Sequence, residues 1–287
     1  MNEQKVVTPD HMQKLYKDIK KAAVTLSTTE VRFLVDSYYI MQEDRKRAHN
    51  QERALGKSEE PHEIITWLKN NSKLMEDELK TVLDLYSDSQ PIGKWMRSNY
   101  GIGPVISAAL LAHIDIKKAP TVGHIWRFAG LDPTSKWEKK TKRPWNAALK
   151  VVCWKIGDSF KKFHNSEECV YGKLYEKRKA YEIARNDSGG NAETAARILT
   201  EKNFDKTTET YKHLISGHLP PAQIDGRAMR WTTKIFLSHL HCVWWWYDTK
   251  TPPPNPFVIQ HMGHVHITKP QNLHMFPGLE EALSHAP

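Results

Sequence analysis

The segment Tyr100–Ala112, with the sequence YGIGPVISAALLA, constrains the fold more than any other part of the chain. Gly101 and Gly103 permit a tight turn, including positive φ, and keep side chains away from an approaching backbone. Pro104 suits the first turn of a following helix, where its missing N–H costs nothing. The small residues after it let that helix pack closely against the preceding one. We therefore predict two helices joined by a tight turn.

The same turn predicts a contact with phosphate. Free amides at the start of its second helix lie at the positive end of the helix dipole, which makes a phosphate site without any basic side chain. Such contacts position a protein on DNA and carry no sequence information. The alternative is an ordinary turn between two helices. The residues expected to contact DNA here are Gly101, Ile102, Gly103, Pro104, Val105 and Ser107.

Helical patterning continues on both sides of the turn, and strand patterning is nearly absent. Ser27 and Glu30 form a capping box that opens a helix running to about Ala54. Further helices are expected over 62–71, 74–86, 144–163, 171–184, 192–202, 211–216 and 224–247, before an irregular tail rich in Pro and His. We predict an all-α helical bundle built around the turn. Its parts are an N-terminal helical layer (1–90), a DNA-binding core (91–185), and C-terminal helices and tail packed on the core (186–287).

The net charge of the chain indicates which classes of partner it can bind. The chain has 287 residues, with 42 Lys and Arg against 33 Asp and Glu and a formal net charge of +9. Such a surplus favours nucleic acid or another polyanion. No stretch approaches the roughly 20 apolar residues of a membrane span, and the N-terminus lacks the apolar core of a secretory signal. Three cysteines are too few for a disulfide framework. We expect a cytoplasmic protein with no membrane partner.

Two basic segments follow the turn. The loop 136–145 sets cations between two tryptophans, so it can neutralise phosphates and stack on an unpaired base. A long helix places Arg227, Arg230 and Lys234 on one face. In both segments the alternative is a solvated surface. The further DNA contacts expected are His124, Arg127, Lys136, Trp137, Lys139, Lys140, Lys142, Arg143, Arg227, Arg230 and Lys234.

Asp36 is the leading candidate for a catalytic carboxylate, because it lies among aromatic residues on a largely apolar helix. Burial there would raise its pKa and favour a role in catalysis or a charged partner. Tyr39 and Glu43 lie one and two turns later on the same face. The alternative is an intrahelical pair between Arg32 and Asp36.

The turn resembles the helix-hairpin-helix family, whose hairpins have a Gly-hydrophobic-Gly turn before a helix of small residues. Residues 95–131 also resemble helix-hairpin-helix DNA glycosylases. In that family a catalytic Asp opens the next helix and a hairpin Lys forms a Schiff base. The corresponding residues here are Gly123 and Val105. The resemblance therefore implies a monofunctional glycosylase whose carboxylate comes from elsewhere, with Asp36, Glu43 and Tyr39 as the candidate catalytic residues.

Residues 98–185 are similar to the C-terminal part of insertion-sequence transposases whose front half is an RNase-H-like nuclease. The similarity rests on Gly101–Pro104, on Trp126–Pro133 (WRFAGLDP) and on a basic helix beyond them. That family carries a nucleophilic serine in a Ser-Ser-Gly-Gly loop, and only Ser135 corresponds here, without the glycines. Residues 1–90 read as helical and also lack the carboxylate-bearing strands of the nuclease half. This resemblance implies a recombination protein that acts with a nuclease or RNA partner.

Other chemistry is less well supported. There is no phosphate-binding P-loop and no dinucleotide fingerprint. The histidines and cysteine near the C-terminus lack zinc-finger spacing and are expected to pack the tail: His239, His241, Cys242, His261, His264 and His266. We expect no metal and no cofactor. The leading hypothesis is a double-stranded-DNA-binding glycosylase that excises a damaged or modified base, for example in phage DNA. The alternatives are transposase-like recombination and DNA binding without catalysis.

Overall fold

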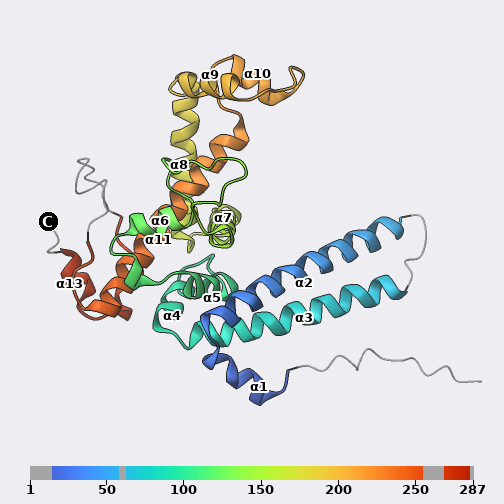
Figure 1. The fold of residues 1–287 in the computed structure, drawn as a ribbon, viewed down its shortest axis with the longest axis vertical. Helices are drawn as coiled ribbons and strands as arrows, with labels where there is room; N and C mark the ends of the chain where they lie inside the picture. The colour runs from blue at the N-terminus through green and yellow to red at the C-terminus, as the bar shows by residue number, and fades with distance from the viewer. Residues whose placement is uncertain (1–14, 58–62, 255–267, 285–287) are drawn as a thin grey trace, which may run out of the picture. The chain divides into compact units, whose positions relative to one another are not determined.

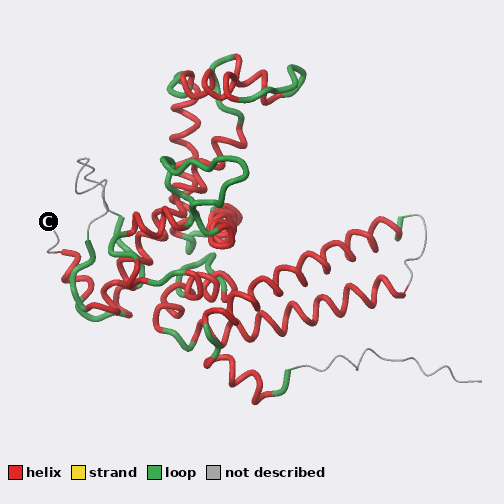
Figure 2. Tube along the Cα trace, viewed as in Figure 1, coloured by secondary structure: helices red, strands yellow, loops and turns green. Residues whose placement is uncertain are grey.

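The computed structural model describes residues 15–57, 63–254 and 268–284 (Figure 1). Every regular element among these residues is a helix, so the prediction of an all-α protein is confirmed (Figure 2). The chain divides into two compact units. Unit 1 comprises Met1–Lys94 and Gly103–Ile114, and unit 2 comprises Trp95–Ile102 and Asp115–Pro287.

None of the described helices combines the length and the apolar character that a membrane span requires.

Unit 1 is built on two long helices, α2 (Thr28–Leu55) and α3 (Glu63–Asp88), which lie side by side (Figure 1). The helix α2 begins at the predicted capping box. The Ser27 amide donates to Glu30 Oε2 at 2.7 Å, and the Glu30 amide donates to Ser27 Oγ at 3.3 Å. Two of the first helical amides are thereby satisfied, so the helix starts at a defined residue.

Ion pairs fix how α2 and α3 align. Arg45 pairs with Glu76 near the middle of the two helices, and the Lys69 Nζ atom lies 2.6 Å from Glu52 Oε2 nearer their connection. Residues that come later in α2 therefore pair with residues that come earlier in α3, so the helices are antiparallel. The short helix α1 (Lys17–Ala22) joins them through Lys20, and the 3₁₀ turn η1 (Ala23–Thr25) leads into α2.

The structure corrects the predicted break between residues 71 and 74, because α3 is one continuous helix. The polar run Asn70-Asn71-Ser72 has a low helix propensity, which suggested an end there. Ser72 and Glu76 are nevertheless buried, 6% exposed each. Packing against a neighbouring helix outweighs propensity, whose effect is only some tenths of a kcal/mol per residue.

The helix α5 (Pro104–His113) completes unit 1 and packs on both α2 and α3. It is apolar on every side and is buried along most of its length, as expected for such a helix. Its buried residues are Val105, Ser107, Ala108, Ala109, Leu110, Leu111 and Ala112. Arg32 on α2 holds its last turn by donating from Nε to the Ala112 carbonyl at 2.8 Å.

Unit 2 is built on three helices, in which the long α11 (Pro221–Thr249) packs against α7 (Ala147–Lys162) and α8 (Val170–Asp187). Its core holds an aromatic cluster in which Phe236 lies against Phe160 (5.6 Å between ring centroids), Tyr171 (5.2 Å) and Trp95 (6.1 Å). Two smaller elements, η2 (Ile116–Lys118) and α6 (Val122–Phe128), also pack on α11.

Unit 2 contains two further parts. The helices α9 (Ala192–Glu201) and α10 (Glu209–Ile215) pack together around Leu214 and Leu219. The tail, predicted to be irregular, contains the 3₁₀ turn η3 (Leu273–Met275) and the helix α13 (Leu279–Ser284) in its described part. The remaining helix, α4 (Pro91–Arg97), precedes the turn at residues 98–103.

His239 gives unit 2 a defined sensitivity to acid. Its Nε2–H donates to the Thr268 carbonyl at 2.7 Å, and its Nδ1 accepts from the Tyr171 hydroxyl at 2.7 Å. Burial lowers the pKa of His239 to about 4. The unfolded chain binds this proton near pH 6.5, whereas the folded protein binds it only near pH 4. Stability is therefore full above pH 6.5 and is lost as the pH falls through this window.

We expect the free energy of unfolding to decrease by as much as about 1.4 kcal/mol per pH unit between these values because of His239 alone. Urea denaturation at a series of pH values measures this slope. In His239→Gln the slope should be shallower, whereas His274→Gln, at an exposed position of the same unit, should keep the wild-type slope. Equal slopes in wild type and His239→Gln would contradict the assignment.

Candidate nucleic-acid interface

The turn before α5 has the backbone geometry that its glycines predict. Gly101 has φ +96°, a conformation that other residues rarely adopt, and a Cβ there would lie 3.2 Å from Phe160 Cδ1. The Ile102 amide donates to the Asn99 carbonyl at 3.0 Å, which closes the turn. Ser159 Oγ donates to the Gly101 carbonyl at 2.5 Å and anchors the turn to α7.

The start of α5 is open. Gly103 is the N-cap in an extended conformation, Pro104 occupies the first turn, and no side chain caps the helix. A Cβ on Gly103 would meet no atom within 4 Å. A backbone phosphate could therefore approach this positive helix end closely.

Three of the predicted contacts at the turn are buried and cannot present their side chains to DNA. Ile102 and Val105 are 4% and 7% exposed, and Ser107 is fully buried with its hydroxyl unpaired among the described residues. The small side chains that suggested a hairpin serve the packing of α5 instead. The parts of the turn that remain candidates for contact with DNA are its backbone and the residues Gly101, Gly103 and Pro104.

The loop between α6 and α7 is held at both ends. Gly130 has φ +65°, and a Cβ there would lie 2.7 Å from Trp145 Cγ. The absence of a side chain at Gly130 therefore makes room for the Trp145 indole. The Asn146 amide donates to the Phe128 carbonyl at 2.8 Å, which brings the end of the loop back to its beginning. Asn146 Oδ1 also accepts from the Leu149 amide at 2.9 Å and caps α7.

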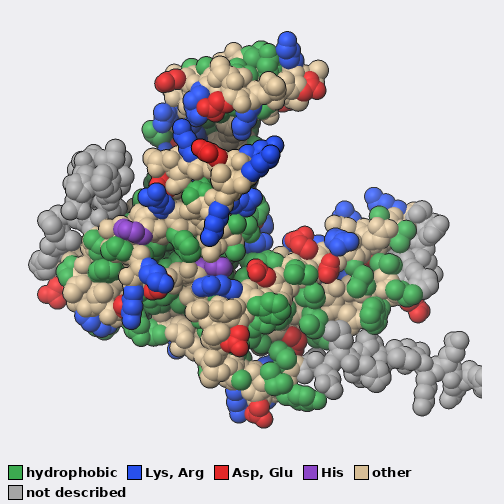
Figure 3. All heavy atoms as spheres, in the orientation of Figure 1, with side chains coloured by type: hydrophobic (Ala, Val, Ile, Leu, Met, Phe, Trp, Pro, Cys, Tyr) green, Lys and Arg blue, Asp and Glu red, His purple; other side chains and the backbone are tan. Residues whose placement is uncertain are grey.

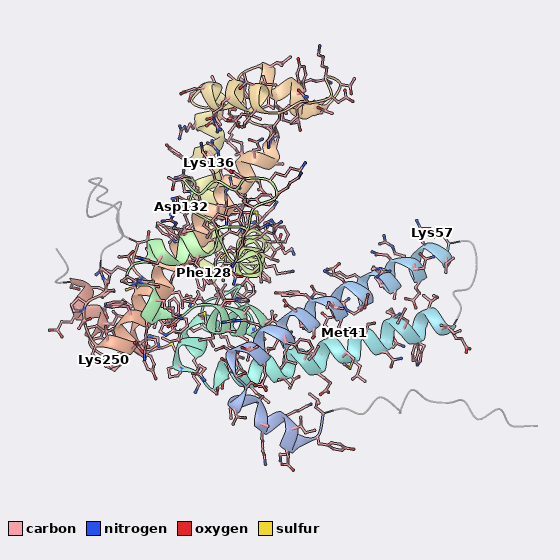
Figure 4. The ribbon with its side chains drawn as sticks, viewed as in Figure 1. Met41, Lys57, Phe128, Asp132, Lys136 and Lys250 are labelled. Carbon is pink, nitrogen blue, oxygen red and sulfur yellow. The ribbon has the colours of Figure 1, made fainter. Side chains whose placement is uncertain are left out.

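Within the loop, two local motifs set the side chains. Asp132 Oδ1 accepts from the amide and the hydroxyl of Thr134, at 2.9 and 2.7 Å, and these bonds lower the pKa of Asp132. Trp137 Nε1 donates to the Thr141 carbonyl at 2.8 Å. Figure 4 labels Asp132 and Lys136 in this loop, beyond Phe128 at the end of α6.

Cations from α6, the loop, α7 and α11 lie near one another in unit 2. We define the basic cluster as Arg127, Arg143, Lys150, Arg230 and Lys234. None of the five forms an ion pair with another described residue, although the carboxylate of Asp132 lies near Arg127 and Lys234. The ion pairs of the described part of unit 2 involve other cations, such as Lys161, Arg178 and Arg227. In the view of Figure 3, Lys and Arg side chains are spread over unit 2, with some Asp and Glu side chains among them.

Burial and mutual repulsion both act on the cations of the cluster. Partial burial lowers the pKa of Lys150, and the charges of Arg143 and Arg230 lower it further. Burial also lowers the pKa of Lys234, and the charge of Arg230 lowers it further. The carboxylate of Asp132 partly offsets this decrease. Because like charges brought together destabilise a fold, the arrangement favours an anion that would neutralise them.

Aromatic residues of the loop and of α6 lie beside these cations. Lys150 Nζ lies 4.1 Å from the ring centroid of Trp145, and Lys234 Nζ lies 4.9 Å from that of Trp126. The remaining predicted contacts on the loop are exposed: Lys136, Trp137, Lys139, Lys140 and Lys142. His124 on α6 is also exposed, with Nδ1 3.0 Å from the Thr121 hydroxyl oxygen.

Arg227, predicted to contact DNA, is placed in a structural role. Its Nη1 donates to Asn191 Oδ1 at 2.9 Å and to Glu182 Oε2 at 3.3 Å. Glu182 is 2% exposed and also accepts from Arg178. A guanidinium that neutralises a buried carboxylate is not available to phosphate, so Arg227 leaves the set of candidate contacts.

The catalytic candidates lie on α2 in unit 1. Asp36 and Glu43 are exposed, and Tyr39 is half-buried with its ring 5.2 Å from that of Tyr38. Burial of Asp36, considered from the sequence, is therefore not found. The alternative pair is not formed among the described residues either, because Arg32 bonds to α5. Base excision through Asp36 stays a prediction from the sequence.

The histidines pack the protein where they are described. His239 is bonded on both ring nitrogens, and His241 Nε2–H donates to the Ala119 carbonyl at 2.8 Å. No group of side chains with metal-binding composition occurs among the described residues. The predictions for His261, His264 and His266 lie outside those residues.

The sequence analysis did not predict Lys150 as a contact, because the apolar pattern of α7 identifies only the face that points into the core. The outward face carries Lys150 and, four residues later, Trp154, which is 60% exposed. In the sequence, Trp154 follows Lys150 by four residues and lies outside the apolar stripe of the helix. That spacing of a lysine and a tryptophan could have identified this face.

Comparisons with protein-family models, with curated proteins and with solved structures gave no match.

Proposed function

We propose that the protein binds double-stranded DNA through its phosphate backbone, with the basic cluster of unit 2 as the principal contact. The observation that carries the proposal is the set of five neighbouring cations without ion-pair partners among the described residues. Phosphate oxygens would add to the partial counter-charge that Asp132 gives Lys234 and that Glu182 gives Arg230. Displaced counterions would drive association.

The turn at Gly101–Pro104 gives independent support for DNA. It offers an uncapped helix start with open space at Gly103, which leaves room for a phosphate to approach the helix amides. Both features contact the backbone and do not distinguish bases. The proposal therefore predicts binding with little sequence preference.

Fluorescence anisotropy with a labelled duplex tests the proposal. Log Kd should rise with log salt concentration with a slope of about 4–5, since five cations each release nearly one counterion. Duplexes of unrelated sequence should bind alike. A slope near zero, or tight binding to heparin without binding to duplex, would overturn the proposal. Assaying the same incubations for abasic sites by alkaline cleavage tests base excision.

A further inference from the structure

Two tryptophans beside the basic cluster are exposed in a way that the fold does not require. Trp137 in the loop is 42% exposed, and Trp154 on α7 is 60% exposed. Phe160 and Phe236 are fully buried in the core of unit 2, whereas a second group of its aromatic residues is exposed: Tyr100, Phe128, Phe163, Tyr181 and Tyr247. Trp137 and Trp154 differ from that second group in being tryptophans next to members of the basic cluster. A large exposed indole loses the stabilisation that burial of its surface would give. An indole held at the surface beside cations indicates a ligand with aromatic rings.

Trp137 is held rigidly although it is exposed. Its indole nitrogen is bonded to Thr141, in a turn that Lys140 closes with φ +73°. The guanidinium carbon of Arg143, a member of the basic cluster, lies 5.2 Å from its ring centroid. The ring is thus fixed at one edge and next to a positive charge. A preorganised ring of this kind binds a second ring with little loss of side-chain entropy.

Trp154 extends the same surface. It follows Lys150 by four residues on α7, so the two side chains share a helix face. Lys150 in turn lies over Trp145. Cation and indole therefore alternate from the loop onto α7, in the order Trp137, Arg143, Trp145, Lys150 and Trp154. Proteins that bind single strands combine these two elements, cations for phosphates and aromatic faces for bases.

We propose that Trp137 and Trp154 stack on unpaired nucleobases while the basic cluster holds the adjoining phosphates. This inference rests on the proposed function and names its substrate class, DNA that contains unpaired bases. An intact duplex hides the faces of its bases and offers only its backbone to this surface. The protein therefore binds DNA with a single-stranded segment more tightly than a perfect duplex.

Anisotropy with three labelled probes tests the inference: a perfect duplex, the same duplex with an internal loop of unpaired bases, and a single strand. The looped and single-stranded probes should bind about tenfold more tightly or better. Trp137→Ala and Trp154→Ala should each remove about tenfold of affinity for these two probes and leave the perfect duplex unaffected. Trp137→Phe should retain most of the affinity, because a phenyl ring also stacks.

The matched control is Trp67→Ala, which removes a 58% exposed tryptophan from α3 in unit 1 and should change nothing. Circular dichroism checks that each variant is folded. Equal affinity for perfect and looped duplexes, unchanged in both tryptophan variants, would overturn the stacking role and leave the proposed function standing. Failure to bind all three probes would overturn the proposed function itself. Tighter binding to RNA than to DNA single strands of the same sequence would overturn the assignment to DNA.

Discussion

Replacing Glu182 by alanine is expected to lower the free energy of unfolding by about 3 kcal/mol. The Glu182 carboxylate is 2% exposed, and its Oε1 atom accepts from Arg178 Nε at 2.9 Å while Oε2 accepts from Arg227. Its removal leaves two guanidinium groups close together without their counter-charge. Both arginine side chains remain about a quarter exposed, so solvent moderates the loss and we expect the lower end of the range for buried pairs.

Urea denaturation and thermal melting measure this effect, and the melting temperature should fall by roughly 6–12 °C. Glu201→Ala is the matched control, because Glu201 pairs with Arg197 across one helical turn with both side chains more than half exposed. Exposed pairs of this kind contribute about 0.3–0.5 kcal/mol. Similar losses in the two variants would show that the Glu182 pairs do not stabilise unit 2.

The sequence predicted features that depend on neighbours along the chain. The Ser27 capping box and the positive φ of Gly101 are examples, because both follow from a few adjacent residues. The all-α class followed from hydrophobic periodicity in the same way. The continuity of α3 did not, because it depends on the burial of Ser72 in a helix that packs against α2, and the sequence pattern does not contain that packing.

In the candidate interface, too, features set by nearby residues in the sequence were predicted and features set by tertiary contacts were not. The positions of Arg143, Arg230 and Lys234 were predicted from local charge, and all three are members of the basic cluster. Arg227 lies on the same helix as two of them, yet it pairs with a carboxylate from α8 that no helical periodicity could reveal. Whether a surface cation is available to a ligand depends on such tertiary partners, and a sequence pattern does not contain them.

Replacing Lys150, Arg230 and Lys234 together by glutamine is expected to weaken duplex binding by about a hundredfold or more at low salt and to reduce the salt slope by about 2–3. Each of these side chains would release close to one counterion when it meets a phosphate. Anisotropy at salt concentrations between about 50 and 200 mM measures both quantities. The control variant removes the same charge from unit 2 at three exposed residues outside the cluster, Lys177, Lys202 and Lys206.

The melting temperature of the triple glutamine variant shows whether the basic cluster is a binding site or a part of the structure that stabilises the fold. Burial lowers the pKa values of Lys150, Arg230 and Lys234, and neighbouring positive charges lower them further, so their charged forms oppose folding. The triple glutamine variant should therefore melt at the wild-type temperature or above it while it loses DNA affinity. A control variant that loses affinity equally would show that net charge alone drives binding. A triple variant that melts lower would show that these cations hold the fold together, and the basic cluster would then lose its role as the DNA contact.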